Sequence, residues 1–123
     1  MLYLIIIMKK LYICSRMIDR QKIVNKIQQI VKGINPSAET ILYGSQARGE
    51  ATSSSDIDVL ILLEGNGEKP SISQEESLKW PLYELELETG VLISPLIMLK
   101  KQWYDRAIKT PFYYNVMNEG VRL

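Results

Sequence analysis

Two short stretches of the sequence could carry chemistry: Gly44-Ser45 and, ten residues later, a pair of aspartates at Asp56 and Asp58. The apolar run 59–63 follows the aspartates, which predicts a buried strand with both acids at its start. Side chains alternate along a strand, so the two carboxylates should point the same way. Two like charges this close raise one pKa unless a cation neutralises them. Mg²⁺ suits such a pair, because it prefers oxygen ligands and usually shares them with substrate phosphates.

The Gly-Ser pair has the context of a phosphate-binding turn. Residues 41–43 predict a strand, Gly44 and Ser45 break it, and a short helix is expected to begin over 46–48. A strand, a turn and a helix start together present free backbone N–H groups to an anion. Gly44 lets a bulky phosphate approach the backbone, and Ser45 adds a hydroxyl donor. Arg48 could supply a forked cation to phosphoryl oxygens.

Each half of this pattern also has an ordinary interpretation. An isolated Asp-x-Asp usually marks a solvated strand end, and an isolated Gly-Ser is usually only a turn. The two halves occur together here, and each falls in the structural context that its function requires. The combination therefore favours a site over two unrelated surface features.

The spacing of Gly44-Ser45 and Asp56-Ile57-Asp58 resembles the signature of the polymerase-beta-type nucleotidyltransferase superfamily. The flanking Tyr43 and residues 47–49, together with the short chain, are similar to its minimal nucleotidyltransferase (MNT) branch. The resemblance extends from about residue 18 to the C-terminus, and its specific motif lies in 43–58.

This resemblance implies an α/β (α+β) fold, with a small mixed β-sheet flanked by helices as in the palm of polymerase beta. It implies that Asp56 and Asp58 hold Mg²⁺ and act in catalysis, and that Gly44 and Ser45, with Arg48, hold the phosphates of ATP or another nucleoside triphosphate. Members of this branch are often encoded beside a helical HEPN-type toxin and act as its antitoxin, in some cases by adenylylating it. The implied function is transfer of a nucleotidyl group, with AMP expected, to a hydroxyl of a HEPN-type partner. The alternative is a catalytically impaired antitoxin that acts by binding its partner only.

One position departs from the pattern of the superfamily. Full nucleotidyltransferases carry a third carboxylate on the strand beside the Asp-x-Asp strand, where it holds metal and accepts the proton of the attacking hydroxyl. The matching position here is Ser94, which does neither well. The departure affects catalysis more than binding of magnesium and nucleotide.

Composition sets limits on the function. A chain of 123 residues is long enough for one domain with a modest core. The net charge of +1 gives no sign of a polycationic nucleic-acid binder, so we expect no direct nucleic-acid binding. The absence of histidine excludes Ser-His and Cys-His nucleophile mechanisms and histidine-ligated zinc. Cys14 is the single cysteine, which excludes an intramolecular disulfide and fits a reducing cytoplasm.

Residues 1–16 form an N-terminal extension that begins with eight apolar residues and turns basic at Lys9 and Lys10. Eight apolar residues are far fewer than the ~20 of a transmembrane helix, so no membrane association is expected. The charge follows the apolar run, which also argues against a signal peptide. An added edge strand, a disordered tail and a natural start at Met17 remain as alternatives, and we favour the start at Met17, with the nucleotidyltransferase domain over 17–123.

Periodicity predicts the remaining elements. An apolar stripe predicts a helix over 18–32 that ends at Gly33. After a loop over 64–70, a capping-box pattern at Ser73 should begin a helix that runs over 74–89, is kinked or restarted at Pro81, and ends at Gly90. Glutamates 84, 86 and 88 should fan around this helix instead of reaching the aspartates.

The C-terminal third predicts one strand and two helices. Residues 91–99 predict a third strand, in which Pro95 requires an edge position or a bulge. A helix is expected over 100–109, and Thr110-Pro111 should cap the next one. The aromatic residues of this segment are expected mostly in the core, with some exposed as a candidate partner surface.

Overall fold

The computed structural model describes Leu4 and residues 20–123. The predicted N-terminal extension and the natural start at Met17 lie outside the described residues. From residue 20 onward the elements in chain order are α2 (Arg20–Ile34), β1 (Glu39–Tyr43), α3 (Gly44–Ala47), β2 (Ile57–Leu63), α4 (Ile72–Thr89), β3 (Ile93–Leu99), α5 (Lys100–Tyr104), α6 (Pro111–Glu119) and β4 (Val121–Arg122).

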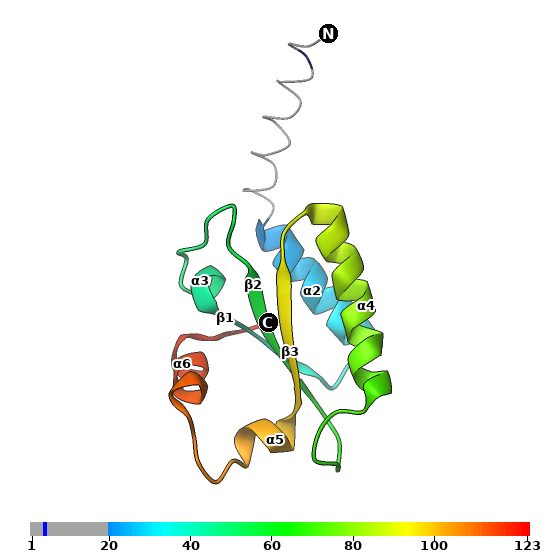
Figure 1. Cartoon of the computed structure of the whole chain (residues 1–123), viewed down its shortest axis with the longest axis vertical. Helices are drawn as coiled ribbons and strands as arrows, with labels where there is room; N and C mark the ends of the chain where they lie inside the picture. The colour runs from blue at the N-terminus through cyan, green and yellow to red at the C-terminus, as the bar shows by residue number, and fades with distance from the viewer. Residues whose placement is uncertain (1–3, 5–19) are drawn as a thin grey trace.

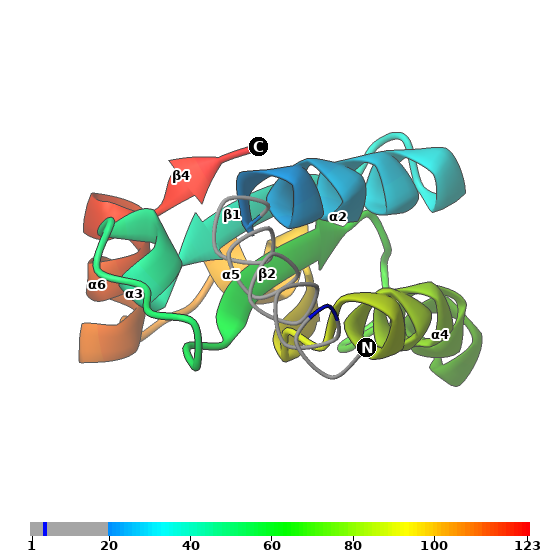
Figure 2. The ribbon, with the colours of Figure 1, turned by 90° about the horizontal axis from the view of Figure 1, so that it is seen from above.

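The strands form one mixed sheet in the order β3-β2-β1-β4. Figure 1 labels β1, β2 and β3, and Figure 2 also labels β4. β1 pairs antiparallel with both β2 and β4, whereas β2 pairs parallel with β3. The register places Asp58 of β2 opposite Tyr43 of β1 on one side and opposite Ser94 of β3 on the other. The predicted α/β fold with a mixed sheet flanked by helices is confirmed.

Helices cover both faces of the sheet. Figure 2 shows α2 and α4 on one side of the strands, with α3 and α6 on the other. One apolar cluster joins α2 and α4 to alternate residues of β2, including Val59 and Ile61. The other cluster joins Trp103 of α5 and Tyr113 of α6 to the intervening residues of β2. By alternation Asp58 belongs to this second face, on the side of α3, α5 and α6.

Helix α2 is amphipathic, as its apolar periodicity predicts, and its buried stripe includes Ile23, Val24 and Ile27. Its predicted end at Gly33 is wrong by one residue, because the helix continues to Ile34. The N–H of Asn35 donates to the carbonyl of Val31 at 2.8 Å and so extends the helical bonding past the glycine. Gly33 does not end the helix, because glycine lowers helix propensity but does not prevent the helix from continuing.

Helix α4 confirms the prediction of one helix that ends at Gly90, whose φ of 70° gives the left-handed C-cap. The predicted cap at Ser73 is wrong. Ser71 accepts from the N–H of Gln74 at 3.1 Å, while the Gln74 side chain accepts from the Ser71 N–H at 2.9 Å. This pair completes the capping box two residues earlier. The helix runs through Pro81 without restarting.

The C-terminal segment is only partly as predicted. Pro95 lies on an edge strand, and Thr110 caps α6 with Pro111 in its first turn, as expected. The helix predicted over 100–109 is wrong in length, because α5 ends at Tyr104. β4 is too short for a periodicity signal and is defined by its pairing with β1. Of the aromatic residues predicted to be mostly core, Trp103 and Tyr113 are buried, while Phe112 and Tyr114 are exposed.

No helix in the described part of the chain is both long enough and apolar enough to cross a membrane.

Gly120 allows the close approach of α6 to β1. Its φ of −65° is available to any residue, but a Cβ there would meet the carbonyl oxygen of Val116 and lie 2.6 Å from a methyl carbon of Ile41. We expect Gly120→Ala to lower the free energy of unfolding by about 1–3 kcal/mol through overpacking. Urea unfolding followed by circular dichroism measures this loss.

Gly33→Ala is the matched control. No atom lies within 4 Å of a Cβ at Gly33, and the residue is helical. This substitution should leave stability unchanged or raise it by about 0.5 kcal/mol through helix propensity. Equal effects of the two substitutions would contradict the steric explanation for Gly120.

Candidate active site

The Gly-Ser turn and the aspartates converge at one end of the sheet. Gly44 follows β1 directly and has a φ of 74°, a conformation that glycine adopts without strain. A Cβ at Gly44 would lie 2.5 Å from the Oδ2 atom of Asp58, so a side chain there would collide with the carboxylate. The antiparallel pairing of Tyr43 with Asp58 produces this proximity, because it places the residue after β1 beside the start of β2.

Ser94 lies beside both aspartates. It is the β3 partner of Asp58 in the parallel register, and its hydroxyl donates to Oδ2 of Asp56 at 3.3 Å. Asp56 precedes β2 by one residue, so alternation points the two carboxylates to the same face. The structure therefore places a hydroxyl where the superfamily pattern has its third carboxylate. Ser94 orients Asp56 and adds no negative charge.

The electrostatics of this corner favour a bound cation. Partial burial raises the pKa of Asp58 above its ordinary value, and the charge of Asp56 acts in the same direction, while Arg48 partly offsets both. Burial also raises the pKa of Tyr43, and the nearby charge of Asp58 adds to the effect. Burial is the larger cause of both pKa shifts, and the neighbouring carboxylate is the second; a divalent cation would relieve that second, like-charge part.

The turn after β1 is a single helical turn, α3, that begins at Gly44 instead of the expected Gln46. Its first N–H groups have no partner inside the helix, as at any helix start. The turn closes with two hydrogen bonds: the N–H of Arg48 donates to Gly44 O at 3.2 Å, and the N–H of Glu50 donates to Ser45 O at 2.9 Å. These bonds fix the backbone of the turn that carries Gly44 and Ser45.

Arg48 is not free to bind phosphate in the described structure. Its Nε donates to Glu50 at 3.0 Å, and its Nη1 donates to Glu119 of α6 at 3.3 Å. These carboxylates are exposed, so both ion pairs are weak and exchangeable. Arg48 remains close enough to influence Asp58, and its role in nucleotide binding stays a prediction.

Arg20 is a member of this region that the sequence reading missed. Its side chain is buried at the start of α2, with 6% exposed. Nε donates to Oε1 of Gln46 on α3, and Nη2 donates to the carbonyl of Ser55, both at 2.7 Å. Its Nη1 is buried without a hydrogen-bond partner. Arg20 thus joins the Gly-Ser turn to the segment that leads into Asp56.

The sequence does contain a signal that Arg20 is buried. Arg20 precedes Ile23, Val24 and Ile27 at helical spacing, so it lies on the buried stripe of α2 and not on its polar face. A cation on an apolar stripe requires buried acceptors. Burial lowers the pKa of Arg20, and the charge of Asp56 partly compensates.

The residues present fit a magnesium ion shared with phosphates. Two adjacent carboxylates supply oxygen ligands, and the Asp58 carboxylate lies against Gly44, where a side chain would displace it. In residues 20–123 no group of three or more acidic, histidine or cysteine side chains could hold a metal ion alone. The remaining ligands would therefore come from water or from a phosphorylated substrate.

A mixed sheet whose central strands bring a Gly-Ser turn against paired aspartates defines a phosphate-transfer domain of the nucleotidyl type. The chain matches the nucleotidyltransferase domain family over residues 24–119 and belongs to that family. The matched region includes Gly44, both aspartates and Ser94, and it begins four residues after Arg20.

A curated relative agrees with this assignment. A protein of Methanocaldococcus jannaschii that carries the provisional name protein adenylyltransferase is 37% identical over 83 residues, which cover 68% of this chain and 75% of the relative. No solved structure matches the chain significantly. The family and the relative together support nucleotidyl transfer as the function.

The contact between Gly44 and Asp58 gives a testable prediction. Gly44→Ala and Gly49→Ala both place alanine at a positive φ, 74° and 72°, so each should lose about 1–2 kcal/mol of stability. Only Gly44→Ala also displaces the Asp58 carboxylate, since no atom lies within 4 Å of a Cβ at Gly49. The ¹³C chemical shift of the Asp58 carboxyl carbon should therefore change in Gly44→Ala alone. An unchanged shift would show that the carboxylate does not fill this space.

Proposed function

We propose that this domain binds Mg²⁺ and ATP and transfers AMP to a hydroxyl group of a protein. The observation that carries the proposal is the convergence of Gly44 and Asp58, since we expect the turn at Gly44 to bind phosphate and Asp58 to hold metal together with Asp56. The provisional name of the M. jannaschii relative supports adenylyl transfer to protein.

Each side chain of the site would have a separate role in metal or phosphate binding. Asp56 and Asp58 would hold the metal, and Ser94 would fix the orientation of Asp56 through its hydrogen bond. Gly44 would admit the phosphates to the backbone, and the Ser45 hydroxyl would donate to a phosphoryl oxygen. When bound, Mg²⁺ supplies stabilisation of the charge on the α-phosphate and the leaving pyrophosphate.

The acceptor that we propose is a HEPN-type protein, because the motif in 43–58 resembles the MNT branch. The acceptor oxygen would bond to the α-phosphorus while the bond to the β-phosphate breaks. The position beside Asp58 on β3 is Ser94, which has no carboxylate to take the proton of the attacking hydroxyl. A slow reaction, or a base brought by the acceptor, follows from that arrangement.

Transfer of label from α-³²P-ATP to the product of the neighbouring gene, in the presence of Mg²⁺, tests this function. We expect Asp58→Asn to reduce labelling by about 100-fold or more, because metal and phosphate positioning are lost together. Asp105→Asn, which removes one exposed charge after α5, should label as the unmodified protein does. Full labelling by Asp58→Asn would refute the proposed role of the pair.

A second candidate function is an antitoxin that acts by binding alone. Ser94 favours it, because the strand beside Asp58 offers a hydroxyl in place of a catalytic carboxylate. The two candidates differ in what the aspartates contribute. If binding alone is sufficient, Asp56→Ala with Asp58→Ala should leave neutralisation of the toxin intact; if transfer is required, neutralisation should be lost while the complex still forms.

Restoring the third carboxylate gives a gain-of-function prediction. Ser94→Asp places a carboxylate next to Asp58 and Asp56, where it can hold metal and accept a proton. A positioned base contributes about 10²–10⁴-fold in rate, so we expect labelling to rise at least tenfold. Ser94→Asn is the uncharged control and should give no increase. A rate for Ser94→Asp that does not exceed that of Ser94→Asn would show that the missing base does not limit transfer.

A further inference from the structure

Helix α4 is apolar on two opposite sides. Its inner side buries Leu78, Leu82 and Leu85 against the sheet. Its outer side exposes four large apolar residues, which we call the α4 ridge: Ile72 (76% exposed), Trp80 (63%), Tyr83 (50%) and Leu87 (66%). A helix that covers one face of a sheet normally turns a polar side to solvent, so the ridge is unexplained by the fold.

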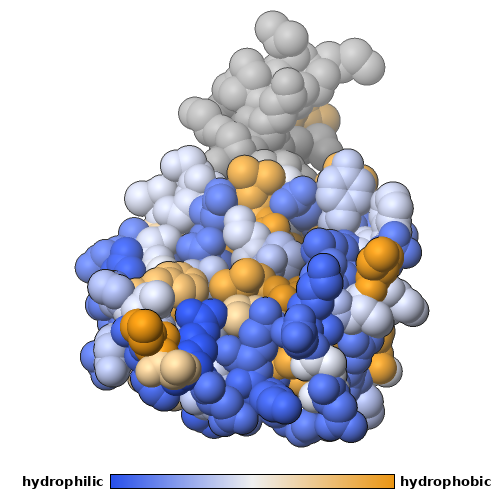
Figure 3. All heavy atoms as spheres, turned by 60° about the horizontal axis from the view of Figure 1, so that its bottom comes forward, coloured by the Kyte–Doolittle hydropathy of each residue, from blue (hydrophilic) through white to orange (hydrophobic). Residues whose placement is uncertain are grey.

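The ridge is one continuous surface. Trp80, Tyr83 and Leu87 are spaced by three and four residues, so they lie along one stripe of the helix. The rings of Trp80 and Tyr83 meet edge to face with centroids 6.3 Å apart. Together with Ile72 they line a hollow of about 590 Å³. Figure 3 shows hydrophobic patches interrupting a mainly hydrophilic face of the molecule. An apolar surface of several hundred Å² on a small domain usually marks an interaction site.

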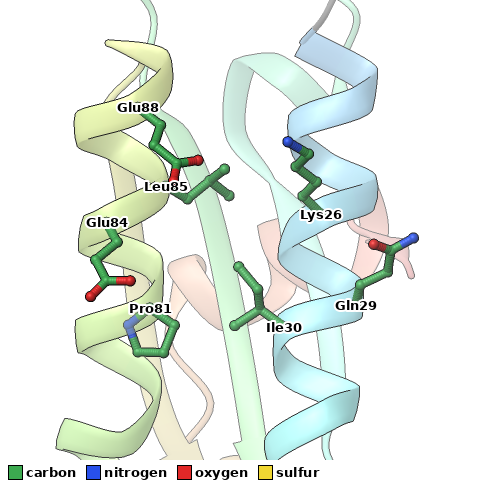
Figure 4. Close-up of a pocket in the computed structure, with 7 residues that line it drawn as sticks. All are labelled: Lys26, Gln29, Ile30, Pro81, Glu84, Leu85 and Glu88. Atoms are coloured by element: carbon green, nitrogen blue, oxygen red, sulfur yellow. The ribbon is translucent and has the colours of Figure 1, made fainter.

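Negative charge borders the ridge. Five glutamates belong to α4, against the single lysine Lys79, which pairs with Glu75 at 3.6 Å. A second hollow of about 350 Å³ separates α4 from α2 and is lined on the α4 side by Glu84 and Glu88. In Figure 4 these side chains project from α4, and Lys26 reaches from α2. The hollow of the ridge is also lined by Glu75, Glu76 and Lys79, so acidic side chains lie within the ridge as well as beside it.

We propose that the α4 ridge is a docking surface for a protein segment that presents an apolar stripe flanked by lysine or arginine. Apolar burial would supply the affinity, and the glutamates would select a basic border. A second copy of this chain fits less well, since pairing two α4 helices would bring glutamates against glutamates. Nucleic acid fits less well for the same reason.

The ridge is separate from the proposed nucleotide site. α4 packs on the face of the sheet that holds Val59 and Ile61, whereas Asp58 belongs to the opposite face. A partner on the ridge would leave the aspartates accessible. The inference therefore does not rest on the proposed function, and docking would persist in a variant that cannot transfer a nucleotide.

Three synthetic helical peptides of equal length test the proposal. The first carries a leucine stripe with Lys and Arg flanks, the second the same stripe with Glu flanks, and the third the basic flanks with a Ser and Gln stripe. Trp80 is exposed and Trp103 is buried, so the fluorescence emission reports contact at Trp80 over a constant background. We expect the first peptide to shift this emission to the blue and to bind at least tenfold more tightly than the other two.

Substitutions on the ridge complete the test, with anisotropy of a labelled first peptide as the readout. Trp80→Ala with Leu87→Ala should weaken binding at least tenfold without lowering the melting temperature, because both side chains are exposed. Ile108→Ala is the matched control: Ile108 is 82% exposed between α5 and α6, and binding should not change.

Three results would overturn the proposal. The first is equal binding of the three peptides, and the second is binding that the double substitution leaves unchanged. The third is sedimentation of the unmodified protein as a dimer that the same double substitution converts to a monomer, because a second copy would then occupy the ridge.

Discussion

The contact between the backbone of Gly44 and the carboxylate of Asp58 is the constraint on which the rest of the site depends. It exists because β1 and β2 are antiparallel neighbours in a register that sets Tyr43 against Asp58. The sheet thus brings the phosphate-binding turn and the acidic pair together, although ten residues separate them in sequence. A shift of the β1–β2 register by one residue would turn Asp58 to the opposite face of the sheet, away from Gly44.

Ser94 gives this domain an unusual balance between binding and chemistry. The two aspartates lie at one end of the sheet, and the neighbouring strand places the hydroxyl of Ser94 beside them. Under the proposed function, a site without the third carboxylate would keep substrate affinity while lowering the rate of the chemical step.

Residue patterns were sufficient to predict that Gly44 and Asp58 lie close together, but not the contacts that hold them in place. Gly44 directly follows one apolar strand and Asp58 lies at the start of the next, which is a local signal. Arg20 and Gln46 are 26 residues apart, and Arg48 and Glu119 are 71 apart. Contacts at such separations depend on how the elements pack, which single-sequence periodicity does not encode. The helix predicted over 100–109 was too long, because α5 ends at Tyr104, and the two-residue β4 is too short to give a periodicity signal.

The two edge strands of the sheet limit how other chains can pair with it. Pro95 removes one backbone donor from β3, and β4, on the opposite edge, has only two paired residues. Neither edge is a good template for strand addition, so the domain should resist edge-to-edge aggregation even when its concentration is high. Recognition of a peptide by β-augmentation is disfavoured as well. Contacts with other macromolecules are consequently left to side chains on the helices and loops.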